Sequence, residues 1–179
     1  MRCTLKIHPD SRCSAVRQIQ VEVARPRAGA LALRYVANGA VDSLALPPIA
    51  EPARADELWR HTCFEAFIRP GSDAAYYEFN FAPSTQWAAY RFQSYREGMR
   101  VALEIGAPRI EVQRTPERFM LQASLQCDDC FAVAREGTWH VGLSAVLEEA
   151  GGGKSYWALA HPPGKPDFHH ADCVALQLQ

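Results

Sequence analysis

The chain has 179 residues, of which 48% are hydrophobic and 22% are charged, and its formal net charge is −1. This length suits one domain with one core, which we place over residues 1–179, and the balanced charge without a basic run disfavours nucleic-acid binding. No apolar stretch approaches the ~20 residues that span a bilayer and the N-terminus has no apolar signal-peptide region, so we expect a cytoplasmic protein without a membrane partner.

Most of the chain alternates between apolar and polar residues, which is the period of a half-buried β-strand. The first two predicted strands flank a short basic turn and form a hairpin, whereas the Pro- and Ala-rich stretch Leu46–Asp56 predicts a surface crossover. A later hairpin is expected to turn at Thr115 and Pro116. The predicted strands are 18–26, 30–36, 58–68, 76–83, 86–92, two within 109–125, 139–149, 155–161 and 174–178.

Helix is scarce in this pattern. Two short helices are predicted, over Ser94–Met99 and Asp128–Gly137. Nine or ten strands without an internal repeat favour an all-β fold, specifically a two-sheet antiparallel β-sandwich.

The three consecutive strands between residues 58 and 92 each have an apolar side and a polar side. In the first, apolar residues 64, 66 and 68 leave His61 and Glu65 on the opposite side, and in the second Glu78 and Asn80 oppose aromatic rings. A sugar offers hydroxyls and weakly apolar CH faces, so its site needs aromatic platforms beside such donors and acceptors. Each Trp can instead fill the core. The ligand-binding candidates on these strands are Trp59, His61, Glu65, Glu78, Asn80 and Trp87.

The run ALAHPPGKPDFHHADC near the C-terminus predicts a loop, because it holds three Pro and one Gly. Loops at the rim of a β-sandwich often carry functional residues. From this loop we take His161, Asp167 and His169 as further ligand-binding candidates.

Two alternatives to simple binding arise from the same residues. Cys127 and Cys130 have CxxC spacing and form a candidate zinc site with His169 or His170, against the alternative of a hydrogen-bonded loop with unrelated thiols. Glu65 and Glu78 are a candidate general acid–base pair, or else acceptors for Arg, Tyr or ligand hydroxyls. The sequence does not set the separation of the two carboxyls.

Two blocks, residues 58–99 and 155–178, carry a family resemblance that extends over essentially the whole chain. LWRHTCFEAFI, YYEFNFAPSTQWAAYRF and SYWALAHPPGKPDFHHADC resemble the bacterial DOMON-like group, which is related to the family 9 carbohydrate-binding modules. The resemblance implies a β-sandwich whose concave face binds a ligand, which in the carbohydrate-binding relatives is a sugar held between tryptophans. Other DOMON relatives bind haem through axial side chains, for which Met99, Met120 and several His are candidates here.

The sequence therefore predicts a non-catalytic module that binds a carbohydrate or a similar small molecule on its concave face, with no catalytic residues and no cofactor. Zinc, calcium and haem stay open as alternatives. The competing classes are an enzyme that uses the carboxylate pair or a metal held by the C-terminal loop, and a scaffold whose polar face binds another protein.

Overall fold

The computed structural model describes residues 1–72, 74–126 and 137–179. These residues form an antiparallel all-β fold with almost no helix, which confirms the predicted class. The strands are β1 (Arg2–Ile7), β2 (Val16–Ala24), β3 (Ala30–Gly39), β4 (Cys63–Pro70), β5 (Tyr76–Phe81), β6 (Trp87–Phe92), β7 (Arg100–Val101), β8 (Arg109–Thr115), β9 (Arg118–Gln126), β10 (Trp139–Glu148), β11 (Lys154–Ala158) and β12 (Leu176–Leu178).

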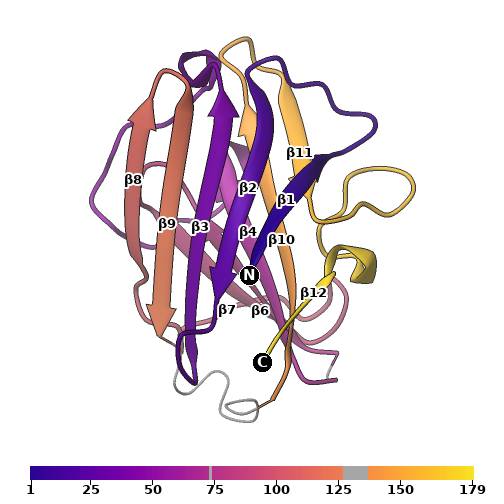
Figure 1. Ribbon diagram of the computed structural model, residues 1–179. Coiled ribbons are helices and arrows are strands. Elements are labelled where there is room, and N and C mark those ends of the chain that lie inside the picture. Colours follow the sequence, from indigo (N-terminus) through magenta and orange to yellow (C-terminus); the bar gives the residue numbers. More distant parts are fainter. Residues whose placement is uncertain (73, 127–136) are drawn as a thin grey trace.

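Hydrogen bonds join all twelve of these strands into one sheet in the order β7-β6-β5-β4-β10-β11-β1-β2-β3-β9-β8, with β12 paired to β10. Strand β1 links the two halves of this order: it pairs with β2 through Arg2–Leu5 and with β11 through Lys6 and Ile7. The pairing thus gives a continuous curled sheet, in which the strand nearest the N-terminus lies beside one near the C-terminus (Figure 1).

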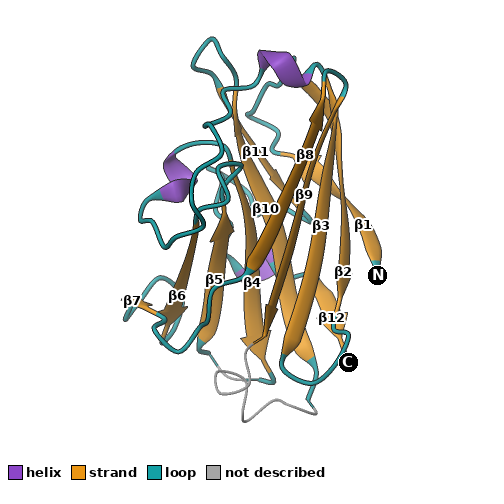
Figure 2. Cartoon of the chain, turned by 90° about the vertical axis from the view of Figure 1, so that its left-hand side faces the viewer, coloured by secondary structure: helices purple, strands orange, loops and turns teal. Residues whose placement is uncertain are grey.

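The main core lies where the sheet curls back on itself. Strands β3 and β9 stand in front of β4 in Figure 1, and the side view in Figure 2 shows β4 and β5 set apart from β2 and β3. The rings of Phe64 on β4 and Phe119 on β9 stack with centroids 5.5 Å apart. Across the same gap, the buried Tyr35 hydroxyl on β3 donates a 2.6 Å hydrogen bond to the Glu65 carbonyl. The two halves of the sheet therefore share one apolar interior.

Alternation along β4, β5 and β6 gives these strands two different environments. Side chains such as Phe64 and Phe79 enter the main core, while their neighbours Phe67 and Tyr76 belong to a second apolar cluster on the opposite face. Both sides are buried because the segments 58–60 and 159–170 cover that second face. Polar groups on this second face are therefore surrounded by aromatic rings.

The helical predictions need correction. Ser94–Met99 forms bends and a bridge between Ser94 and Glu97 rather than a helix. Gly98 within it has a φ of 62°, a left-handed conformation that ends any regular helix. The other predicted helix, Asp128–Gly137, lies outside the described residues except for Gly137. Helical turns occur instead as three-residue 3₁₀ elements, η1 (Val41–Ser43), η2 (Leu58–Arg60) and η4 (Ala171–Cys173).

None of the described segments is a helix with the length and apolarity needed to cross a membrane.

Candidate functional site

A pocket of about 490 Å³ lies on the second face of the sheet, over β4, β5, β10 and β11. Its volume falls in the range of small-molecule sites. Aromatic and aliphatic side chains make its walls, cations stand at its rim and two carboxyl groups lie at its floor. The lining residues are Trp59, Arg60, Glu65, Glu78, Phe92, Arg96, Met99, Val146, Lys154, Tyr156, Pro166, Phe168 and His169.

The strand register brings the two carboxyl groups together. Glu65 on β4 pairs with Asn80 on β5, so Glu78, two residues before Asn80, lies diagonally across on the same face. On the other side of β4, Glu65 pairs with Ser144 of β10. Both carboxyls are thus fixed by the central strands of the sheet and not by loops.

Glu65 is a buried acid that lacks a full set of partners. The side chain is 2% exposed, and its Oε2 accepts a 3.4 Å hydrogen bond from the Ser144 hydroxyl. Its Oε1 has no hydrogen-bond partner among the described residues. Burial, reinforced by the charge of Glu78, raises the pKa of Glu65 well above its usual value, and the Ser144 hydrogen bond opposes this only in part. Burial thus favours the protonated form of Glu65, which carries an O–H donor.

Glu78 is held in place from below. Its Oε1 accepts a 2.8 Å hydrogen bond from the Asn80 amide, and the Asn80 carbonyl in turn accepts from the Cys63 thiol at 3.5 Å. Burial raises the pKa of Glu78 to about 7, although the Asn80 hydrogen bond and the charge of Arg96 act in the opposite direction. A carboxyl that titrates near neutrality inside a pocket is a frequent mark of a functional site.

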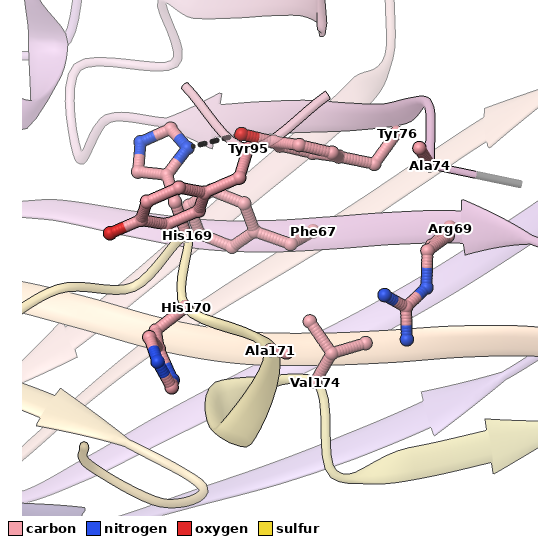
Figure 3. Close-up of a pocket in the computed structure, with 9 residues that line it drawn as sticks. All are labelled: Phe67, Arg69, Ala74, Tyr76, Tyr95, His169, His170, Ala171 and Val174. Atoms are coloured by element: carbon pink, nitrogen blue, oxygen red, sulfur yellow. Dashed lines mark hydrogen bonds between the residues drawn. The ribbon is translucent and has the colours of Figure 1, made fainter. Parts of the chain in front are cut away.

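His169 forms a wall beside Glu78 and is surrounded by aromatic rings. Its ring meets those of Phe67 and Phe92 edge to face, each with centroids 5.0 Å apart. Its Nδ1 lies 2.8 Å from the Tyr76 hydroxyl, as Figure 3 shows. That hydroxyl accepts a hydrogen bond from the Arg96 backbone N–H, so we assign its own proton to His169 Nδ1.

This arrangement leaves the imidazole proton of His169 on Nε2. Burial, assisted by the charge of Arg96, lowers the pKa of His169 to about 4, so the ring is neutral at pH 7. Nε2 lies 3.6 Å from Glu78 Oε2, which is too long for a hydrogen bond. His169 Nε2 therefore offers the pocket a donor and Glu78 Oε2 offers it an acceptor, and the two do not bond to each other.

Asp167 positions the segment that carries His169. Arg96 forms a 2.7 Å ion pair with its Oδ1, the Tyr95 hydroxyl bonds to its Oδ2, and the His169 backbone N–H bonds to Oδ1 at 3.1 Å. Burial opposes its ionisation, but these hydrogen bonds outweigh burial and lower the pKa of Asp167. Asp167 is thus an ionised anchor between two loops and does not itself line the pocket.

The structure brings four of the predicted site residues into this pocket: Trp59, Glu65, Glu78 and His169. Asn80, which is fully buried, supports Glu78 from beneath without lining the pocket. Trp59 is half-buried, lines the pocket, and its ring meets that of Tyr90 edge to face with centroids 5.6 Å apart.

The other candidates lie elsewhere. Trp87 is 3% exposed in the main core, on the opposite face from Glu78, with the Arg54 guanidinium 4.0 Å above its ring. His61 is exposed and its Nδ1 contacts Glu148 at 2.7 Å. His161 donates from Nε2 to the Lys6 carbonyl at 2.9 Å and lies beside the buried His8.

Several lining residues were not among the sequence candidates. Phe92 and Tyr156 follow the strand alternation, since each lies on the face opposite a core residue of its own strand. Arg96 and Lys154 sit on the rim, and no periodic signal marks such positions. Phe168 lies next to His169 within the predicted C-terminal loop, and its apolar character gave no reason to select it.

The alternatives that require metal or haem find little support in the described residues. No group of three or more His, Cys, Asp or Glu side chains is arranged there to hold a metal ion, and Cys127 and Cys130 lie outside those residues. The His169 and His170 rings lie apart (Figure 3). His170 Nδ1 accepts a hydrogen bond from the Asp172 backbone N–H.

The two methionines named as axial candidates for haem lie in different surroundings. Met120 lies on β9 with its sulfur 3.0 Å from Arg34 Nε, in the other half of the sheet from the pocket. Met99 does line the pocket with His169, but Nδ1 of that imidazole is engaged by the Tyr76 hydroxyl and Nε2 lies 3.6 Å from Glu78 Oε2. Iron bound at Nε2 would meet the Glu78 carboxyl.

No family model matches the chain, and no curated protein matches it. Among solved structures, the fold is similar to that of a protein from Bacteroides uniformis ATCC 8492 described as a putative carbohydrate-binding protein. The TM-score is 0.67 at 14% sequence identity, and the match covers 97% of this chain and 83% of the other. The likeness shows that the two share a fold.

Proposed function

We propose that this protein is a non-catalytic binding module for a carbohydrate or a carbohydrate-like small molecule, and that the ligand occupies the pocket above Glu65 and Glu78. Sugar recognition needs aromatic surface for the CH faces and mixed donors and acceptors for the hydroxyls. Trp59 and Tyr156 offer the first, and Glu65, Glu78 and His169 the second.

One observation carries this proposal: Glu65 Oε1 at the floor of the pocket is buried without a hydrogen-bond partner among the described residues, beside a His169–Glu78 pair too far apart to bond to each other. A ligand hydroxyl between His169 Nε2 and Glu78 Oε2 would accept from the imidazole and donate to the carboxylate, which are 3.6 Å apart. Glu65 Oε1, without a partner in the described structure, would bond to a second hydroxyl. Buried polar groups left unpaired cost free energy, so a ligand that pairs them gains affinity.

Calorimetric titration of the protein with a panel of mono- and disaccharides tests the proposal. At least one sugar is expected to bind. Trp59→Ala is expected to lower the affinity for that sugar about tenfold, since a stacked aromatic ring is a typical dominant contact. Glu78→Gln should lower this affinity as well, because the amide cannot reproduce a carboxylate acceptor.

His61→Ala is the matched control, because His61 is a polar residue on the segment before β4 that lies outside this pocket. It should bind the sugar like the wild type. Absence of heat with every sugar would refute the proposal, as would equal effects of the His61 and Trp59 substitutions.

We also propose a more specific fold and a cellular location. We infer a DOMON-like two-sheet sandwich related to the family 9 modules, and a reducing, cytoplasmic location. Contact between the halves of the curled sheet, as at Phe64 and Phe119, supports the first. The four cysteines within the described residues are all unpaired, which supports the second.

A second candidate is catalysis by the carboxyl pair. The observation in its favour is that Glu65 and Glu78, both buried and both with raised pKa values, line the same pocket. In such a pair the protonated Glu65 would act as acid and the ionised fraction of Glu78 as base. Hydrolysis of an aryl glycoside that is lost in both Glu65→Gln and Glu78→Gln would favour this candidate over binding alone.

A further inference from the structure

A second, smaller cavity of about 240 Å³ adjoins the candidate sugar pocket and shares His169 with it. Figure 3 shows its residues: Phe67, Tyr76 and Tyr95 on one side, Ala171 and Val174 on another, and Arg69 at one end. The volume is enough for one six-membered ring with a substituent. Aromatic rings favour an aromatic guest through offset and edge contacts.

Arg69 gives this cavity its charge. It is on β4 in the same alternation as Glu65 and Phe67, so its side chain lies on the pocket face of the sheet. Arg69 as a whole is half-buried and, among the described residues, has no ion-pair or hydrogen-bond partner. A guanidinium has five N–H donors in a planar fork that matches a carboxylate.

Other polar groups of the cavity have partners within the protein. The Tyr76 hydroxyl pairs with His169 Nδ1, the Tyr95 hydroxyl with Asp167, and His170 Nδ1 with the Asp172 N–H. His169 is neutral at pH 7. Within the part of the chain that the structure describes, Arg69 is thus the charged group of the lining without a counter-ion.

We propose that this cavity is a separate binding site for a small monocyclic aromatic carboxylate, whose ring lies against Phe67 and Tyr76 and whose carboxylate pairs with Arg69. The assignment rests on the shape, lining and charge of this cavity and does not depend on sugar binding next door. Partial burial makes the ion pair stronger than a fully exposed one.

Three ligands separate the contribution of the aromatic ring from that of the negative charge. Benzoate carries both the ring and the charge, benzamide is its neutral isostere, and acetate is the charge without the ring. We expect benzoate to bind about tenfold more tightly than either of the others. Two-dimensional ¹H–¹⁵N NMR titration of the full chain measures the three affinities, and the shifts should centre on residues 67–69 and 171–174.

Two variants test the site itself. Arg69→Gln should lower the affinity for benzoate about tenfold, so that benzoate no longer binds more tightly than benzamide. Ala171→Phe fills the cavity without altering charge and should abolish benzoate binding, since Ala171 is exposed on η4 and tolerates a larger side chain. Arg17→Gln, the same charge change on an exposed position of β2, is the control and should bind benzoate normally.

Equal affinities of benzoate and benzamide, or unchanged benzoate binding in Arg69→Gln, would overturn the proposal. So would shifts centred on Trp59 and Lys154, which belong to the larger pocket. These outcomes are independent of the sugar titration, because a protein that binds no sugar can still bind benzoate at Arg69, and the reverse also holds.

Discussion

At the scale of single residues, the floor of the larger pocket is the most unusual part of the molecule. Arg96 is the cation that lowers the pKa of Glu78, whereas the adjacent His169 is neutral and Glu65 is another acid. The sheet holds this carboxyl in place through Asn80 rather than through an ion pair. Ionising Glu78 in this environment costs free energy, so the stability of the protein should depend on pH.

We therefore predict that Glu78 makes the folded state less stable as pH rises. Its pKa is about 7 when folded, against 4.5 ordinarily, so between these values the folded state retains a proton that the unfolded chain has released. The free energy of unfolding should fall across that window by about 3 kcal/mol from this group. Glu78→Gln keeps the acceptor for Asn80 and removes the titration, so its stability should gain on the wild type from pH 4.5 to 8.

Urea unfolding of both proteins at several pH values measures this difference. Glu117→Gln, an exposed carboxyl in the β8–β9 turn, is the control and should leave the pH profile unchanged. A constant difference between Glu78→Gln and the wild type across the window would contradict the prediction.

At the scale of elements, the end of β3 depends on close backbone approach. Gly39 pairs with Val16 beside an irregularity in the β2 register, and its N–H bonds to the Glu117 carbonyl at 2.9 Å. A Cβ on Gly39 would lie 2.0 Å from the Ala15 carbonyl oxygen, which already accepts from the Ala40 N–H. Neither strand can move aside without losing these bonds.

Gly39→Ala should consequently destabilise the fold by about 3 kcal/mol, at the upper end for overpacking. Thermal or urea unfolding provides the measurement. Gly151→Ala in the β10–β11 turn has no heavy atom within 4 Å of the added Cβ and should change stability by less than about 0.5 kcal/mol. Similar stabilities for the two variants would show that the contact at Gly39 relaxes freely.

Most elements could be predicted from the sequence because each strand has its own alternation. The hairpin of β8 and β9 turns after Thr115 as expected, and the segregation of Phe64 from Glu65 follows directly from the period of two. Strand β1 was missed, although CTLKI alternates, because it is short and its partners lie in distant segments. The helix expected at Ser94–Met99 failed because Gly98 takes a left-handed conformation there.

The site could be predicted only in part, for a similar reason. Alternation correctly separates Trp87 from Tyr90, but it does not say which face looks into the core. Both faces of β6 are apolar, so the sequence leaves that choice to the tertiary arrangement. The cavity at Arg69 depends on the segment around Val174 folding back over β4, and no local pattern records such a contact.

At the scale of the whole molecule, the pairing of β1 with both β2 and β11 requires contact between segments near opposite ends of the described chain. The walls of the larger pocket likewise come from residues 59–99 and 146–169. Such non-local topology makes loop closure costly before any contact forms.

Refolding should therefore be slow for this length, with a main phase in the millisecond-to-second range typical of non-local β proteins. Stopped-flow tryptophan fluorescence after dilution from urea follows it, using the buried Trp139 and Trp157 as reporters. The rate should not depend on protein concentration. Recovery of nearly all the signal within the first millisecond would contradict this view of the topology.

The polar floor also has a consequence for how the sheet is assembled. A slip of one residue in the pairing of β4 or β5 would exchange their two faces and place Glu65 or Glu78 in the main core, among the rings of Phe64 and Phe119. Burying a carboxyl there without its pocket and its partners would cost several kcal/mol. Glu65 and Glu78 thus penalise a one-residue misalignment, so replacing them by apolar residues would make the sheet less selective about its own register.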